Sequence, residues 1–273
     1  MNKKPDIEFL ISTMNRSDLR FLDHMFQHHN LNELKILIIN QTTKDNILES
    51  DNENIRVVNA FEKGLSRSRN LAIKHATGEI CFIADDDIEY LPEVIDVVTK
   101  AYQDYPDSAL ISFQYLRENN KTFKIYHYKS GYQHRLLHRQ ALTSFEMCIN
   151  LNLVKSENIR FNTCFGLGAH FTSGEEGVFR DDLVRAGLKV AYVSKPIVVH
   201  YGKTSVDAEG SKKYTKALTA TKYLQHKNFI YLWLIRYIWL LLKRKSISIF
   251  QISKIWIYGV TAVQDYKRLC SKQ

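Results

Sequence analysis

Residues 79–87 read EICFIADDD, an apolar run that ends in three consecutive aspartates. Side chains from Ile80 to Ala84 are apolar on both faces of an extended strand, which is typical of a strand in the middle of a parallel sheet. The three carboxylates follow at the carboxyl end of that strand. Because ligands bind at this edge of open α/β sheets, the run predicts both a central strand and the place of a site.

Short apolar runs alternate with helical segments on both sides of this strand. Further strands are predicted at 7–12, 35–40, 54–58 and 108–113, and helices at 17–30, 66–75, 92–105 and 175–186. This alternation predicts a mostly parallel sheet flanked by helices, an α/β fold. Residues 115–140 have no clear period, and a last strand pair is expected to end at His200.

The aspartates Asp85, Asp86 and Asp87 repel one another, and a bound cation would relieve that repulsion. If the backbone stays extended, Asp85 and Asp87 point to one side and Asp86 to the other. Such a D-x-D motif offers hard oxygen ligands to Mg²⁺ or Mn²⁺, which then bridges to substrate phosphates. A solvated acidic turn before the helix at 92–105 is the alternative.

The positive charge of the chain lies in its C-terminal quarter. The formal net charge is +9, made of −3 over residues 1–209 and +12 over residues 210–273. Residues 210–264 hold ten Lys or Arg, no acid and all three tryptophans. The apolar run 229–242 is too short to cross a bilayer, because its helix would reach about 21 Å against a core of roughly 30 Å.

We therefore expect residues 210–264 to form helices that bind a membrane surface, with Trp at the interface and Lys and Arg facing anionic lipid. Nucleic acid is the rival anion, but the basic residues alternate with Leu and Ile instead of polar residues. Packing on the catalytic body or on a second subunit remains open. The predicted domains are residues 1–205 and the tail 206–273.

The cysteines and the N-terminus both favour the cytoplasm. Cys81, Cys148, Cys164 and Cys270 lack metal-ligand spacing, so we expect them to be reduced. The first residues contain no apolar signal region, so we expect no secretion. Together with the tail, these features predict a cytoplasmic protein on the inner face of the plasma membrane.

Three motifs around the aspartates resemble those of the family 2 glycosyltransferases of the GT-A fold. They read ISTMNR at 11–16, GLSRSRNLA at 64–72 with ATGE at 76–79, and FGLG at 165–168 with GEE at 174–176. Their order and spacing make the resemblance specific over residues 5–202. It implies a GT-A sheet with a C-terminal helical appendage, and sugar transfer from a nucleotide-diphosphate sugar, with a UDP-sugar as the expected donor.

The resemblance also implies roles for individual residues. Those expected at the nucleotide sugar are Ser12, Thr13, Asn15, Asn40, Arg69, Asn70, Asp85 and Asp86. The implied ligands of Mg²⁺ or Mn²⁺ are Asp85, Asp87 and His200, and the implied general base is Glu176, with Glu175 beside it at the acceptor. Two departures from the family pattern are Asn40-Gln41, where many relatives carry aspartates, and Glu176 in place of the commoner Asp.

A single base with in-line attack implies inversion at the anomeric carbon. The expected acceptor is a glycan or a polyprenyl-linked lipid in surface polysaccharide synthesis, with a homo-oligomer possible. Two other classes remain open, a nucleotidyltransferase that releases pyrophosphate and a non-catalytic sugar-nucleotide-binding or membrane scaffold protein.

Overall fold

The computed structural model describes residues 5–118, 121–122, 124–133, 141–201 and 209–270. Contacts group the chain into two compact units. The first unit comprises residues 1–63, 67–160 and 179–202, and the second comprises 64–66, 161–178 and 203–273. The predicted domain boundary at residue 205 lies outside the described residues.

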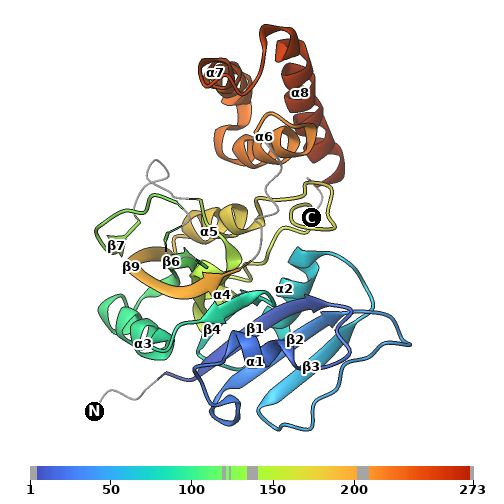
Figure 1. Cartoon of the computed structure of the whole chain (residues 1–273). Coiled ribbons are helices and arrows are strands. Elements are labelled where there is room, and N and C mark those ends of the chain that lie inside the picture. The colour runs from blue at the N-terminus through green and yellow to red at the C-terminus, as the bar shows by residue number, and fades with distance from the viewer. Residues whose placement is uncertain (1–4, 119–120, 123, 134–140, 202–208, 271–273) are drawn as a thin grey trace. The chain divides into compact units, whose positions relative to one another are not determined.

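The first unit is built on a mixed sheet with the strand order β3-β2-β1-β4-β8-β6-β9-β5, and β7 pairs with β9 (Figure 1). The strands are β1 (Ile7–Met14), β2 (Lys35–Gln41), β3 (Ile55–Ala60), β4 (Ile80–Asp85), β5 (Ile88–Tyr90), β6 (Ser108–Arg117), β7 (Gly131–Tyr132), β8 (Met147–Asn150) and β9 (Lys189–His200). Strands β1 to β4 are mutually parallel, whereas β8 runs antiparallel between β4 and β6. The run at residues 79–87 is thus an interior strand, as its sequence predicts.

Three of the four predicted helices are present within two residues of their predicted ends, and the first is much shorter than predicted. The helices of this unit are α1 (Phe21–Met25), η1 (Leu31–Glu33), α2 (Leu65–His75), α3 (Val94–Asp104), η3 (Ser144–Glu146), α4 (Leu151–Ser156) and α5 (Glu175–Arg185), of which α2 and α5 begin on residues of the second unit. The predicted helix at 17–30 is wrong beyond α1. The Asp18 side chain accepts from the Arg20 N–H at 3.0 Å, and the His28 ring is bound to Glu89 at 2.9 Å, so local and tertiary bonds replace helical ones at both ends.

The predicted strand pair before His200 is a single long strand. β9 lies parallel to β6, and the register between them shifts at three points, two of them beside Pro196. Proline has no N–H to donate to the ladder, which fits an irregular register at this point of a continuous strand.

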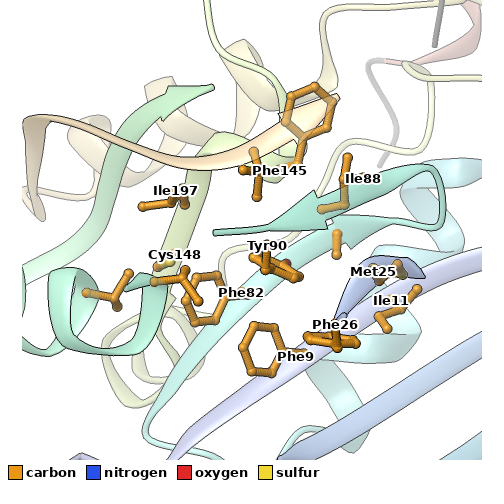
Figure 2. Close-up of a cluster of buried hydrophobic side chains, with 14 of the residues drawn as sticks. Phe9, Ile11, Met25, Phe26, Phe82, Ile88, Tyr90, Phe145, Cys148 and Ile197 are labelled. Atoms are coloured by element: carbon orange, nitrogen blue, oxygen red, sulfur yellow. The ribbon is translucent and has the colours of Figure 1, made fainter. Parts of the chain in front are cut away.

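Stacked aromatic rings hold β1, β4 and β5 together in the core (Figure 2). The Phe9 and Phe82 rings stack with centroids 4.4 Å apart, and Tyr90 meets both edge-on. All three rings are buried. Their packing holds β4, which ends at the first of the three aspartates, against β1 and β5.

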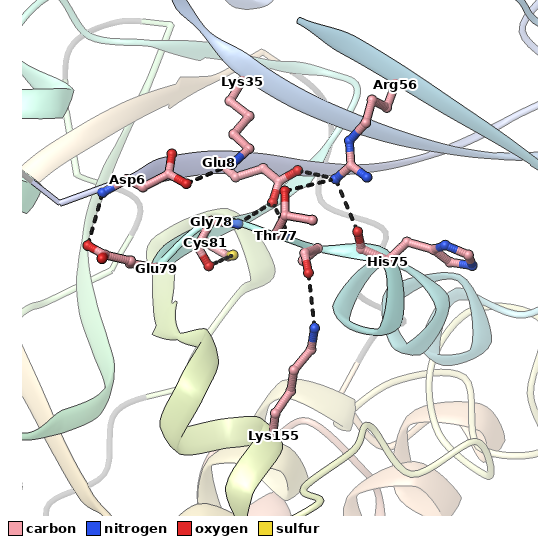
Figure 3. A network of polar contacts seen from close by, with 11 residues as sticks. Asp6, Glu8, Lys35, Arg56, His75, Thr77, Gly78, Glu79, Cys81 and Lys155 are labelled. Atoms are coloured by element: carbon pink, nitrogen blue, oxygen red, sulfur yellow. Dashed lines mark hydrogen bonds and ion pairs between the residues drawn. The ribbon is translucent and has the colours of Figure 1, made fainter.

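A buried carboxylate ties the amino ends of the strands (Figure 3). Glu8 is fully buried and accepts from Arg56 at 2.5 Å, from the Thr77 N–H at 2.7 Å and from the Gly78 N–H at 2.8 Å. A Cβ at Gly78 would lie 2.7 Å from the Cβ of Glu8, so only glycine allows this approach. The network secures the end of the sheet opposite the aspartates.

The second unit consists of α6 (Lys212–His226), α7 (Ile230–Lys243), η4 (Lys227–Phe229), η5 (Ile249–Gln251) and α8 (Ile252–Leu269), with residues 161–178 packed against α6 and α8. The predicted helical appendage is therefore present. α8 meets α7 closely, since a Cβ at Gly259 would lie 2.5 Å from the Leu234 side chain. Among the described helices, none combines the length and the apolar character needed to cross a bilayer.

The expectation that all four cysteines are reduced is wrong for two of them. Cys164 and Cys270 form a disulfide within the second unit, across 106 residues of sequence. Cys81 and Cys148 are free and buried, and burial raises the pKa of the Cys81 thiol. No motif spacing marks this pair in the sequence, because the fold alone brings the two residues together.

Candidate functional site

The three aspartates at the end of β4 contact three different parts of the first unit. Asp85 accepts from the Arg69 guanidinium of α2 at 3.1 Å and from the Ser144 hydroxyl of η3 at 2.7 Å. β4 ends at Asp85, and the next two residues bend towards β5. The extended backbone assumed for alternating side chains is therefore absent, and each aspartate takes its own direction.

Asp86 faces the polar turn that follows β1. Its Oδ2 accepts from the Thr13 hydroxyl and, at 2.8 Å, from Nε of Arg16. Asn40 binds the Arg16 backbone on both sides, accepting from its N–H at 3.1 Å and donating to its carbonyl at 3.0 Å. Asn15 is exposed with φ of 55°, and its N–H donates to the Gln41 carbonyl at 2.9 Å.

These bonds assign different parts to the predicted nucleotide residues at this turn. Thr13 binds Asp86 directly. The fully buried Asn40 instead stabilises the turn through its bonds to the Arg16 backbone. Arg16 lies inside the quoted motif, yet its contact with Asp86 was not predicted.

The α2 side of the site is buried. The Ser68 hydroxyl donates to the Ser12 hydroxyl at 2.9 Å and so ties α2 to β1. Arg69 is only 1% exposed, and its ion pair with Asp85 places a buried cation directly behind the strand end. Asn70 follows on the same helix and is half-buried.

Asp87 pairs with His200 across the β5–β9 ladder. Its Oδ2 lies 3.3 Å from Nε2 of His200, whose side chain is 8% exposed, while the Asp87 side chain is 55% exposed. The hydrogen bond with His200 lowers the pKa of Asp87 below its ordinary value, so the carboxylate is ionised at neutral pH. The Phe145 ring stacks on the imidazole with centroids 5.1 Å apart and planes at 11°.

The predicted metal ligands are brought together only in part. Within the described part of the chain, no three His, Cys, Asp or Glu side chains form a group suited to a metal ion. Asp87 and His200 are adjacent, whereas Asp85 is engaged by Arg69 and Ser144. Because Mg²⁺ in nucleotide enzymes is bound by one or two carboxylates and completes its shell with water and phosphate, Asp87, with His200 beside it, is the residue that would hold a cation shared with a substrate.

Glu175 and Glu176 open α5 in the second unit. Gly166 has φ of 101°, and a Cβ there would lie 3.2 Å from both the Glu175 carboxyl carbon and the Ser66 hydroxyl. Glu175 is buried against this turn, while Glu176 is half-buried. Glu176 is therefore the more accessible acid of the pair.

Two residues of η3, Ser144 and Phe145, belong to the site but were missed by sequence reasoning. Ser144 binds Asp85, and Phe145 stacks on His200. No sequence motif marks these two residues, and only the fold places them against the ends of β4 and β9.

A mixed sheet whose interior strand ends in carboxylates, beside a polar turn after the first strand, defines the class of GT-A nucleotide-sugar transferases. The family model described as glycosyl transferase family 2 matches residues 10–171, and the chain belongs to this family. The protein is a glycosyltransferase, as predicted.

Solved structures of TarS from S. aureus share the fold. TarS 1-349 matches 96% of this chain and 72% of its own, with 13% identity and a TM-score of 0.55. Its complex with UDP matches 80% and 65%, at 16% identity and a TM-score of 0.55. Its complex with UDP-GlcNAc matches 80% and 66%, at 14% identity and a TM-score of 0.53. A search of the curated proteins finds no match.

Proposed function

We propose that this glycosyltransferase moves a sugar from a UDP-sugar to an acceptor hydroxyl, with inversion and with help from a divalent cation. The observation that carries the proposal is the ionised Asp87 against His200, one residue beyond the Asp86 contacts with Thr13 and Arg16. The UDP and UDP-GlcNAc complexes of the similar TarS structures support the choice of donor.

The protein groups divide the work of transfer. Asp87 and His200 would hold Mg²⁺ or Mn²⁺, which supplies positive charge to the leaving diphosphate. Arg16 and Thr13 orient Asp86 at the nucleotide sugar. Arg69 would fix the Asp85 carboxylate through their ion pair, since its guanidinium is 1% exposed and lies 3.1 Å from Asp85. Glu176 would take the proton of the attacking hydroxyl.

A donor screen with matched variants tests this proposal. UDP-sugars are incubated with Mg²⁺, Mn²⁺ or EDTA, and the released UDP and the anomeric configuration of the product are measured. Loss of general-base catalysis in Glu176→Gln should lower kcat by about 10²- to 10⁴-fold while UDP binding is retained. The control Glu157→Gln changes an exposed acid after α4 and should leave kcat unchanged. Retention of configuration, or full activity in EDTA, would contradict the proposal.

We further propose that the acceptor is a glycan or polyprenyl-linked carrier of a surface polysaccharide, met at the cytoplasmic face of the plasma membrane. Support comes from a set of exposed apolar side chains on the second unit, here called the tail surface. It consists of the exposed side chains Phe229, Tyr231, Leu232, Ile235, Trp239, Ile249, Phe250 and Ile257. The basic run Lys243, Arg244 and Lys245 begins on the last residue of α7, which suits contact with anionic lipid.

A further inference from the structure

The short helix η3 touches both halves of the site with consecutive side chains. Ser144 donates to Oδ2 of Asp85 at 2.7 Å, and the next residue, Phe145, stacks on the His200 ring. Asp85 ends β4 and His200 ends β9. η3 is therefore a physical link between a carboxylate at the nucleotide and the histidine of the proposed cation pair.

A buried carboxylate anchors η3. Glu146 is 0% exposed and accepts from Lys124 Nζ at 2.7 Å, from the Thr143 N–H at 2.9 Å, from the Thr143 hydroxyl at 2.7 Å and from the Tyr126 hydroxyl. Burial and the neighbouring Glu146 charge raise the pKa of Tyr126, so its phenol remains a donor. An ionised carboxylate is stable inside a protein only when such donors surround it.

Helix capping alone does not account for these contacts. Thr143 completes the capping box by itself, as its hydroxyl and N–H both meet Glu146. Lys124 and Tyr126 come from the separate segment after β6. The Lys124 ammonium also lies 5.9 Å from the centre of the Tyr115 ring, and that ring meets Phe145 edge-on at 4.9 Å. The Phe145 ring is thus held between His200 on one side and a cation-supported tyrosine on another.

We propose that Glu146 and Lys124 are positioning residues of the cation site. Their ion pair fixes η3, which orients the Asp85 carboxylate through Ser144 and sets the plane of the His200 ring through Phe145. The orientation of that ring determines where Nε2, which lies 3.3 Å from Asp87 Oδ2, would meet a cation held by the pair. This inference rests on the proposed metal-dependent transfer.

The test measures binding of Mn²⁺ in the presence of UDP by isothermal titration calorimetry. Glu146→Gln preserves the shape of the side chain but removes its charge, and it should weaken Mn²⁺ binding by about 10-fold, the lower end of the cost of losing a direct partner of metal ligands, because Glu146 acts only through η3. Phe145→Leu should weaken Mn²⁺ binding in the same direction. The double variant Lys124→Met/Glu146→Gln should bind no more weakly than Glu146→Gln, because both changes break one interaction.

Glu8→Gln is the matched control. Glu8 is equally buried and equally paired with a cation, but it lies at the amino ends of the strands. It should lower the unfolding temperature and leave Mn²⁺ affinity within about twofold, within the ordinary context-dependence of distant substitutions. This contrast separates positioning of the cation site from general stability.

Three results would overturn the inference. The first is unchanged Mn²⁺ affinity in folded Glu146→Gln. If that variant does not fold, unchanged affinity in both Phe145→Leu and Ser144→Ala is equally decisive. Absence of Mn²⁺ binding by the unaltered protein with UDP would overturn the proposed cation chemistry together with this inference, whereas failure of the variants alone overturns only the inference.

Discussion

Arg69 and Asp87 are two charged residues of the site that differ strongly in the exposure of their side chains. Arg69 is 1% exposed, so its guanidinium depends on partners such as Asp85 for charge compensation. The Asp87 side chain is 55% exposed and lies next to a histidine. Neighbouring aspartates of one motif therefore differ in kind, since Asp85 supports a buried cation and Asp87 is open to a ligand.

This difference predicts opposite outcomes for two substitutions. Asp85→Asn weakens the pair with Arg69 and should lower the free energy of unfolding by about 1–3 kcal/mol. Asp87→Asn should change stability by no more than about 0.5 kcal/mol, yet lower kcat/KM by about 10²-fold or more through loss of charge stabilisation. Urea unfolding and steady-state kinetics on both variants check this, and equal stability losses would refute the division of roles.

The sequence could predict that the aspartates, the motif at 11–16 and Arg69 lie at one edge of the sheet, because each sits in a local pattern tied to a strand end or a helix. It could not predict which side chains these residues contact. Whether the Asp85 carboxylate is open to a metal ion or already bound by a serine depends on Ser144 of η3, which lies 59 residues further along the chain. Sequence patterns specify which groups are present at the strand end, whereas tertiary packing specifies which of them are already engaged.

At the scale of helices and strands, the sequence again predicts what local patterns carry and misses what neighbouring segments decide. The five predicted strands of the first half begin within one residue of the observed β1, β2, β3, β4 and β6, because buried apolar runs carry their own signal. β5 and β8 were missed, since strands of three and four residues are too short to show a period. The antiparallel pairing of β8 between β4 and β6 is set by neighbours, not by its own residues.

In the second unit, Asp265 of α8 joins three segments. It accepts from Lys216 of α6 at 2.6 Å, from His170 at 3.1 Å and from Arg268 at 3.1 Å. Burial favours the protonated form, but the hydrogen bonds from Lys216 and His170 outweigh it, so the pKa of Asp265 lies below its ordinary value of 3.8. The carboxylate is the only acid among residues 210–273.

A lowered pKa gives stability that depends on pH in a defined direction. The contribution of Asp265 is complete above pH 3.8 and is lost as the pH falls through its lower folded value. Asp265→Asn should therefore be less stable than the unaltered protein at pH 7, by about 1–3 kcal/mol, with the difference shrinking near pH 3. Urea unfolding at both pH values measures this, with Asp104→Asn on α3, an exposed i,i+4 partner of Lys100, as the control.

The disulfide gives a second prediction for this unit. Cys164 precedes the turn against which Glu175 is buried, and Cys270 follows α8. A cross-link that closes so long a loop stabilises a fold by about 2–4 kcal/mol, so dithiothreitol should lower the unfolding temperature. Alkylation after unfolding without reductant should label Cys81 and Cys148 and spare the other two, and labelling of all four cysteines would refute the pairing.

At the scale of the whole molecule, charge is divided along the chain. Residues 1–209 carry a net charge of −3 and contain the aspartates, while residues 210–273 carry +12. The tail surface adds exposed apolar area to the basic part, with Leu232 65%, Trp239 56% and Phe250 85% exposed. An anionic bilayer satisfies both features at once, because it offers negative headgroups above an apolar interior.

Vesicle sedimentation tests this proposal against packing on a second copy. The protein should bind vesicles that contain phosphatidylglycerol, bind more weakly to phosphatidylcholine alone, and dissociate as salt screens the basic residues. Leu232→Glu/Trp239→Glu should lose vesicle binding, because it places charge on the buried side of the contact. The control Ile125→Glu alters a side chain that is 97% exposed in the first unit and should bind normally. A lipid-free dimer that the double glutamate variant converts to a monomer would instead assign the tail surface to self-association.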